Sequence, residues 1–160
     1  MRVAFVALAL AALVTSASAA DLFAGSWKIV PEKSKNNWGQ KPAQSLTRTY
    51  ASNASGGYDV KIDGTDADGK PISDTLQAAN DVERSVTNST QQVVKALGAT
   101  HVKSHRVNAS TIVATYYKDG KAVGTSTSTV SEDGHTLTMK LAGTSTDGKK
   151  LTGVSVYEKQ

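Results

Sequence analysis

Cysteine is absent from this chain of 160 residues. Without thiols the protein cannot use thiol catalysis, iron–sulfur clusters or zinc sites built on thiolates. Aromatic residues make up only 6% of the chain, which argues against a surface on which nucleic-acid bases stack. Blocks of like charge are also absent: 18 basic and 14 acidic residues are interspersed, leaving a net charge of +4. This pattern is typical of a soluble surface, and we expect no nucleic-acid partner.

Long apolar runs are missing except at the beginning of the chain. Residues 3–14 are apolar, follow a single arginine and lead into small residues with an Ala-x-Ala pattern. The run is too short to span a bilayer as a helix, which disfavours the alternative of an uncleaved membrane anchor. The sequence therefore predicts a secretory signal peptide over 1–20, cleaved after Ala19 or Ala20. We expect a periplasmic or secreted protein with one domain, 21–160, and no stable membrane span.

Alternation with period two is the clearest pattern in the rest of the chain. Tyr58, Val60 and Ile62 alternate with charged residues, and Asp-Gly turns separate further segments rich in Thr, Val, Tyr and Ser. We expect about nine strands on short links, near residues 25–30, 45–51, 57–63, 71–78, 100–107, 111–118, 121–131, 135–142 and 151–158. The prediction is an all-β fold, an antiparallel up-and-down meander that closes into a barrel, because closure removes sheet edges.

Residues 88–98 break this alternation. The segment starts with polar residues, places Val93, Val94 and Leu97 at helical spacing and stops at a glycine, so one short helix is predicted. Such a helix either plugs one end of the barrel with its apolar face, which we favour, or forms a lid over the barrel mouth.

The acidic stretch DGTDADGK, residues 63–70, has the composition of a calcium loop but not its spacing. An EF-hand loop needs an oxygen ligand at its first position and a glutamate at its twelfth, and these positions hold Gly64 and Thr75. The segment 58–72 also recurs without a gap as 137–151, and the extra acids do not recur. We therefore interpret the stretch as a hairpin turn and expect no metal site.

The stretch GSWKI begins the first predicted strand, with Gly25 and Trp27 in a Gly-x-Trp pattern. This pattern resembles the first strand of lipocalins and related small barrels, which implies that Trp27 packs across one barrel end beside Gly25. In those proteins an arginine of the last strand often joins the tryptophan, whereas the last strand here, LTGVSVYEK, has none. The stretches LTRTY, GTDADGKPI and VYEK resemble a family of small secreted bacterial proteins described as lipocalin-like, without an assigned function. The resemblance implies a calycin-type β-barrel in the cell envelope.

Two arginines alternate in phase with apolar residues on their predicted strands. If those faces point inward, Arg48 and Arg106 both enter the barrel and need a partner, since an unpaired buried charge is costly. An anionic ligand, such as the carboxylate of a fatty acid, would serve as this partner. Tyr50 and Tyr116 would add hydroxyl groups to the same site.

The same arginines have an alternative placement at the barrel ends. There each guanidinium would stack on Trp27 or pair with Asp74 or Glu83. This placement keeps the charged head in water while the aliphatic stem packs, which is common behaviour for arginine.

The sequence thus supports two hypotheses about function. In the first, an exported small β-barrel binding protein holds a small anionic, hydrophobic or amphiphilic ligand, bound by the two arginines and two tyrosines. In the second, the barrel is filled and acts as a structural or protein-interaction module of the cell envelope, with contacts in the loops 31–43 and 79–99 and at Trp38. We find no Gly-x-Ser-x-Gly elbow and no phosphate-binding motif, so neither an enzyme nor a cofactor is expected.

Overall fold

The computed structural model describes residues 21–37 and 41–160. The predicted signal peptide and the predicted contacts of Trp38 therefore lie outside the described residues. Within those ranges, no helix is long and apolar enough to cross a membrane.

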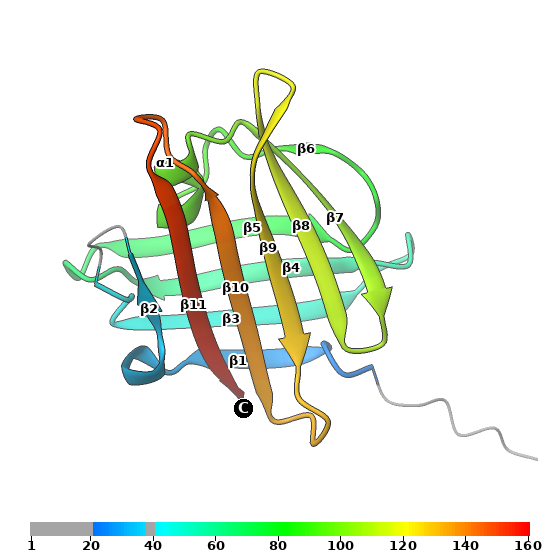
Figure 1. The fold of residues 1–160 in the computed structure, drawn as a ribbon. Helices are drawn as coiled ribbons and strands as arrows, with labels where there is room; N and C mark the ends of the chain where they lie inside the picture. Colours follow the sequence, from blue (N-terminus) through cyan, green and yellow to red (C-terminus); the bar gives the residue numbers. More distant parts are fainter. Residues whose placement is uncertain (1–20, 38–40) are drawn as a thin grey trace, which may run out of the picture.

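The described chain forms one antiparallel sheet and one short α-helix (Figure 1). The strands are β1 (Gly25–Ile29), β2 (Lys35–Asn36), β3 (Ser45–Ser52), β4 (Tyr58–Thr65), β5 (Pro71–Ala78), β6 (Arg84–Ser85), β7 (His101–Asn108), β8 (Thr111–Lys118), β9 (Lys121–Val130), β10 (Thr136–Thr144) and β11 (Lys150–Lys159). A 3-10 turn, η1 (Pro31–Lys33), joins β1 to β2, and the helix is α1 (Gln92–Leu97). The predicted all-β fold is confirmed. The strands that the sequence did not predict, β2 and β6, have only two residues each.

The sheet order explains how the meander curls. It runs β5-β4-β3-β1-β11-β10-β9-β8-β7-β6, so the first strand lies between the third and the last. Trp27 of β1 is opposite Lys159 on one side and Arg48 on the other. Figure 1 shows β1, β3, β4 and β5 crossing behind β8, β9, β10 and β11. The two halves of the meander therefore enclose a common interior.

The two free ends of the sheet, β5 and β6, face each other across a seam. Within the described residues, no strand register joins β5 to β6 or β7. The chain that follows β5 instead contacts β7, because the N–H of Ala79 donates to the hydroxyl of Ser104 at 2.9 Å. The N–H of Asp81 also donates to the carbonyl of Ser104 at 2.9 Å. The molecule is thus a curled half-barrel, and loop contacts bridge its seam.

The repeated segments of the sequence form two hairpins with the same turn. Asp66 accepts the N–H of Lys70 through its Oδ1 at 2.9 Å, and Ser145 accepts the N–H of Lys149 through its Oγ at 3.0 Å. The glycine before each lysine has a positive φ, 79° and 82°, as such tight turns require. The acidic stretch is a hairpin turn, as predicted. In the described part of the chain, no group of three or more metal-ligating side chains is arranged to hold an ion.

Two apolar clusters fill the interior. The larger one contains Phe23, Trp27 and Tyr58, which are almost fully buried. The smaller one is formed by α1, whose Val94 and Leu97 are buried against Tyr116 and Leu151. Helix α1 buries its apolar face at one end of the half-barrel, as the plug hypothesis expects (Figure 1).

Glycines on neighbouring strands make room for this helix. Gly124 of β9 lies opposite Gly143 of β10. A methyl group built on either glycine would come within 3.0 Å of the Leu97 side chain. The small residues of β9 therefore have a packing role, because they admit the helix into the barrel end.

Candidate ligand-binding site

Arg48 points into the barrel from the middle of β3. Residues of a strand alternate between the two faces of the sheet, and Leu46, Arg48 and Tyr50 form the buried face of β3. Arg48 is only 7% exposed. Its Nε donates to the hydroxyl of Tyr157 at 3.2 Å, and its Nη2 donates to the Oε1 of Gln91 at 2.7 Å. The guanidinium is thus held by two neutral groups on different elements.

Arg48 forms no ion pair with any carboxylate of the described residues. Asp74 lies in the same row of the sheet, since Arg48 is opposite Ile62 and Ile62 is opposite Asp74. However, Asp74 accepts hydrogen bonds from the Ser89 hydroxyl at 2.9 Å and from the Thr90 N–H at 3.1 Å. An arginine buried without a counter-ion is costly, so this position needs an explanation.

The surroundings of Arg48 keep it charged. Burial opposes the charged form, but the neighbouring hydroxyl groups, with Tyr157 first and Tyr50 next, raise the pKa of Arg48 above its usual value. Burial in turn raises the pKa of Tyr50, which therefore stays neutral. The interior holds a fixed positive charge surrounded by neutral acceptors.

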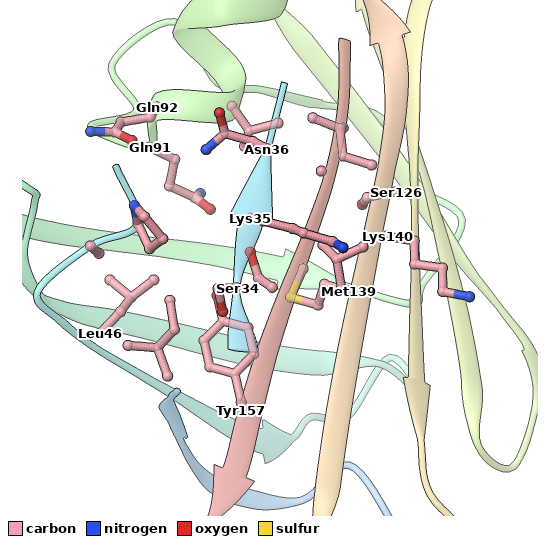
Figure 2. A pocket seen from close by; sticks show the side chains of 18 of the residues that line it. Ser34, Lys35, Asn36, Leu46, Gln91, Gln92, Ser126, Met139, Lys140 and Tyr157 are labelled. Carbon is pink, nitrogen blue, oxygen red and sulfur yellow. The ribbon is translucent and has the colours of Figure 1, made fainter. Parts of the chain in front are cut away.

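A cavity of about 130 Å³ opens next to Arg48. Its walls combine apolar side chains, Leu46, Ile72 and Met139, with the polar groups of Tyr157 and Gln91. In Figure 2 the side chains of Leu46, Gln91, Met139 and Tyr157 converge on the hollow, whereas Lys140 points away from it. The lining residues, all within the described ranges, include no aspartate and no glutamate. The arrangement has the chemistry to bind a group that is apolar at one end and anionic at the other.

A second hollow, of about 660 Å³, lies at the seam between β5 and the segment 84–91. Its lining is mostly polar and includes Asp59, Asp74 and Arg84. Gln91 lines both this hollow and the inner cavity. Gln91 therefore stands between Arg48 and the seam.

The structure separates the four residues that the sequence grouped into one site. Of these four, only Arg48 lines the inner cavity. Tyr50 belongs to the larger cluster, with its ring centre 5.9 Å from that of Phe23. Tyr116 belongs to the smaller cluster, with its hydroxyl 3.4 Å from that of Ser126, a cavity residue.

Arg106 lies away from the cavity and has its own anion. Its Nη2 donates to the Oδ1 of Asp21 at 2.8 Å, and its guanidinium lies 5.4 Å from the ring centre of Tyr58. The hydroxyl of Tyr58 also donates to Asp21 at 2.6 Å. Burial would raise the pKa of Asp21, but the hydrogen bonds from Tyr58 and Arg106 outweigh it and hold that pKa below its usual value. The partner of Arg106 is thus Asp21, and neither Asp74 nor Glu83 pairs with an arginine among the described residues.

Gly25 and Trp27, predicted to pack at a barrel end, both lie against Lys159 of the last strand. Trp27 is fully buried, and its Nε1 donates to the carbonyl of Phe23 at 2.8 Å. The Nζ of Lys159 lies 5.0 Å from the centre of the Trp27 ring and donates to the carbonyl of Leu22 at 3.2 Å. A methyl group on Gly25 would come within 3.3 Å of the Lys159 side chain. A lysine of the last strand thus lies over the ring of Trp27.

Sequence reasoning missed two residues that contact Arg48. The alternation of buried and exposed residues could have indicated Tyr157, because it lies on the buried face of β11. Gln91 gave no such indication, since it lies at the polar start of the predicted helical segment, directly before α1.

Comparison with known proteins finds similar folds but no sequence family. No family model matches the chain, and no curated protein matches it either. The fluorescent protein UnaG in its wild-type form is similar, with a TM-score of 0.56 and 16% identity over 86% of this chain and 97% of that chain. A mutant of UnaG gives a TM-score of 0.52 and 18% identity over 87% and 96%. The zebrafish ileal bile acid-binding protein complexed with cholic acid gives 0.49 and 10% over 87% and 99%.

The UnaG structures show that this chain shares their fold. They do not test the resemblance to small secreted bacterial lipocalin-like proteins, which stays a prediction.

Proposed function

We propose that this protein is an exported binding protein that holds one small anionic amphiphile in its half-barrel, with Arg48 binding the anionic group. The observation that carries the proposal is a buried arginine that lacks an acidic partner among the described residues and faces a cavity. A guanidinium presents five N–H donors in a planar fork that matches a carboxylate or phosphate group. A bound anion would be the counter-ion of Arg48, as Asp21 is the counter-ion of Arg106.

The walls of the cavity support an amphiphile rather than an inorganic ion. Leu46, Ile72 and Met139 offer apolar surface, and each methylene buried against such surface contributes about 0.8 kcal/mol. Lys35 and Lys41 also line the cavity and add positive charge beside it. The predicted signal peptide is the basis for proposing that the protein works outside the cytoplasm.

The alternative function, a filled barrel that contacts another protein, has one observation in its favour. The cavity of about 130 Å³ is smaller than the roughly 300–1,000 Å³ of ordinary ligand pockets. Under this alternative, Arg48 would be a structural group held by Tyr157 and Gln91.

Native mass spectrometry of the protein purified gently from its host separates the two functions. We expect an added mass on the parent protein that disappears in Arg48→Gln. Arg106→Gln is the matched control, because it makes the same chemical change outside the cavity, and it should keep the added mass. An added mass that Arg48→Gln retains would contradict the role of Arg48. A bare chain in all three proteins would favour the filled barrel.

A further inference from the structure

The free space next to Arg48 limits the size of a ligand. A protein cavity of about 150 Å³ lined by apolar side chains holds one benzene molecule. The cavity of about 130 Å³ therefore has room for roughly six non-hydrogen atoms. A long acyl chain needs several times this volume.

Packed side chains fill the two apolar clusters on either side of the cavity. Phe23, Tyr50 and Tyr58 form a triangle with ring centres 5.7 to 6.0 Å apart. Leu97 of α1 reaches the glycine pair of β9 and β10 in the other cluster. These side chains are 5% exposed or less. The space cannot lengthen toward either cluster without displacing a well-packed group, which is energetically unfavourable. The seam hollow beyond Gln91 has mostly polar lining residues and offers little to a long acyl chain.

Gln91 occupies a donor of Arg48 that an anion would use. Its Oε1 lies 2.7 Å from Nη2 of Arg48, a distance typical of an ionised partner. A charged oxygen forms roughly twice as strong a hydrogen bond to a guanidinium as a neutral oxygen does. An anion that binds Nη2 would therefore displace the amide of Gln91, which precedes α1 and also faces the seam hollow.

We propose that the ligand is a compact monoanion, such as a short-chain or small aromatic carboxylate, whose oxygen takes the place of the Gln91 amide oxygen on Arg48. The inference rests on the proposed function and narrows it. The apolar body, of about six carbon atoms, fills the cavity beside Leu46, Ile72 and Met139, while the carboxylate takes the space that the Gln91 amide leaves. Gln91 acts as a specificity-determining residue, since a ligand that binds Nη2 of Arg48 has to compete with its amide.

Calorimetric titration with straight-chain carboxylates from butyrate to palmitate, and with benzoate, tests the size limit. We expect Kd to fall about fourfold for each added methylene up to roughly hexanoate, and then to stop falling. Benzoate should bind about as well as hexanoate, because its ring fits the available space. An affinity that keeps rising to palmitate would overturn the size limit.

Substitutions at Gln91 test the competition. Gln91→Glu keeps the side-chain shape and places a carboxylate on Arg48, so we expect hexanoate affinity to fall about tenfold or more while Tm rises. Gln91→Ala removes the competitor and should raise the affinity. Gln160→Glu is the matched control, because it makes the same chemical change at a residue that lines neither hollow. Equal losses in Gln91→Glu and Gln160→Glu would overturn the role of Gln91.

The same titrations distinguish failure of this inference from failure of the proposed function. If no carboxylate of any length binds the parent protein, or if Arg48→Gln binds them equally well, the proposed function itself is wrong. If binding depends on Arg48 but favours long chains, only the size limit is wrong.

Discussion

Two regions of the half-barrel hold an arginine in opposite ways. On β7, the side chain of Arg106 is 31% exposed and has a carboxylate partner in Asp21. In the middle of β3, Arg48 is 7% exposed, yet it has only the neutral oxygens of Tyr157 and Gln91. The more deeply buried charge is thus the one without a counter-ion. The difference indicates that Arg106 stabilises the fold, whereas the proposed function depends on the charge of Arg48, which has no counter-ion among the described residues.

The largest effect on stability should come from removing the carboxylate of Asp21, the partner of Arg106. Asp21→Ala loses the hydrogen bond from Tyr58 and the ion pair with Arg106, and leaves that arginine partly buried without a partner. We expect the free energy of unfolding to fall by about 3 kcal/mol, measured by urea denaturation.

Asp63→Ala is the control for this substitution. It removes an ion pair of 3.0 Å with Lys61 in which both side chains are well exposed. We expect a change of about 0.5 kcal/mol or less. Similar losses in the two variants would mean that the cluster around Asp21 contributes no more than an ordinary surface pair.

A second prediction compares the arginines directly. Arg106→Met should lower the free energy of unfolding by about 2 kcal/mol, because Asp21 loses its charged partner. Arg48→Met should leave it unchanged or raise it slightly, because methionine fills a similar space and removes a buried charge without a counter-ion. If Arg48→Met lowers the free energy of unfolding as much as Arg106→Met does, then Arg48 is a structural residue and the contrast between the two arginines fails.

The smallest expected effect is the pH dependence of the stabilisation that Asp21 provides. The pKa of Asp21 in the folded state lies below its ordinary value of 3.8. A carboxyl group with a lowered folded-state pKa stabilises the protein above its unfolded-state pKa, and this contribution is lost as pH falls through the folded-state value. The stability difference between the parent and Asp21→Asn should therefore be constant above about pH 5 and narrow towards about pH 2.

Urea denaturation at several pH values checks this prediction. Asp63→Asn serves as the control, because its carboxylate lies in an exposed ion pair with Lys61. A difference between the parent and Asp21→Asn that persists unchanged in acid would mean that the Asp21 charge contributes nothing to folding.

The strands were predictable because their spacing records which side is buried. Tyr58, Val60 and Ile62 are all 1% exposed or less, as the alternation predicted. Strands β2 and β6 were not predicted, because a segment of two residues is too short to show alternation. The repeated hairpins were predictable as well, since Asp66 and Ser145 receive the same backbone hydrogen bond in equivalent turns.

The site was only partly predictable, because its partners come from distant parts of the sequence. Alternation placed Arg48 inside with Leu46, but Gln91 is 43 residues away and Asp21 is 85 residues from Arg106. No periodic pattern links residues so far apart, so sequence reasoning could not tell which arginine had an anion. The separation of the two arginines depends on how the sheet curls, which only the strand order reveals.

The position of β1 in the sheet also has a consequence for the order of folding. One edge of β1 pairs with β3, but its other edge pairs with β11, the last strand in the chain. During synthesis from the amino terminus, β1, β3, β4 and β5 can form a small sheet whose β1 edge stays open until β11 is available. The contact that completes the sheet is among the most distant in the chain, and such non-local pairing slows folding. The docking of β11 between β1 and β10 is therefore the step that converts two separate sheets into one interior.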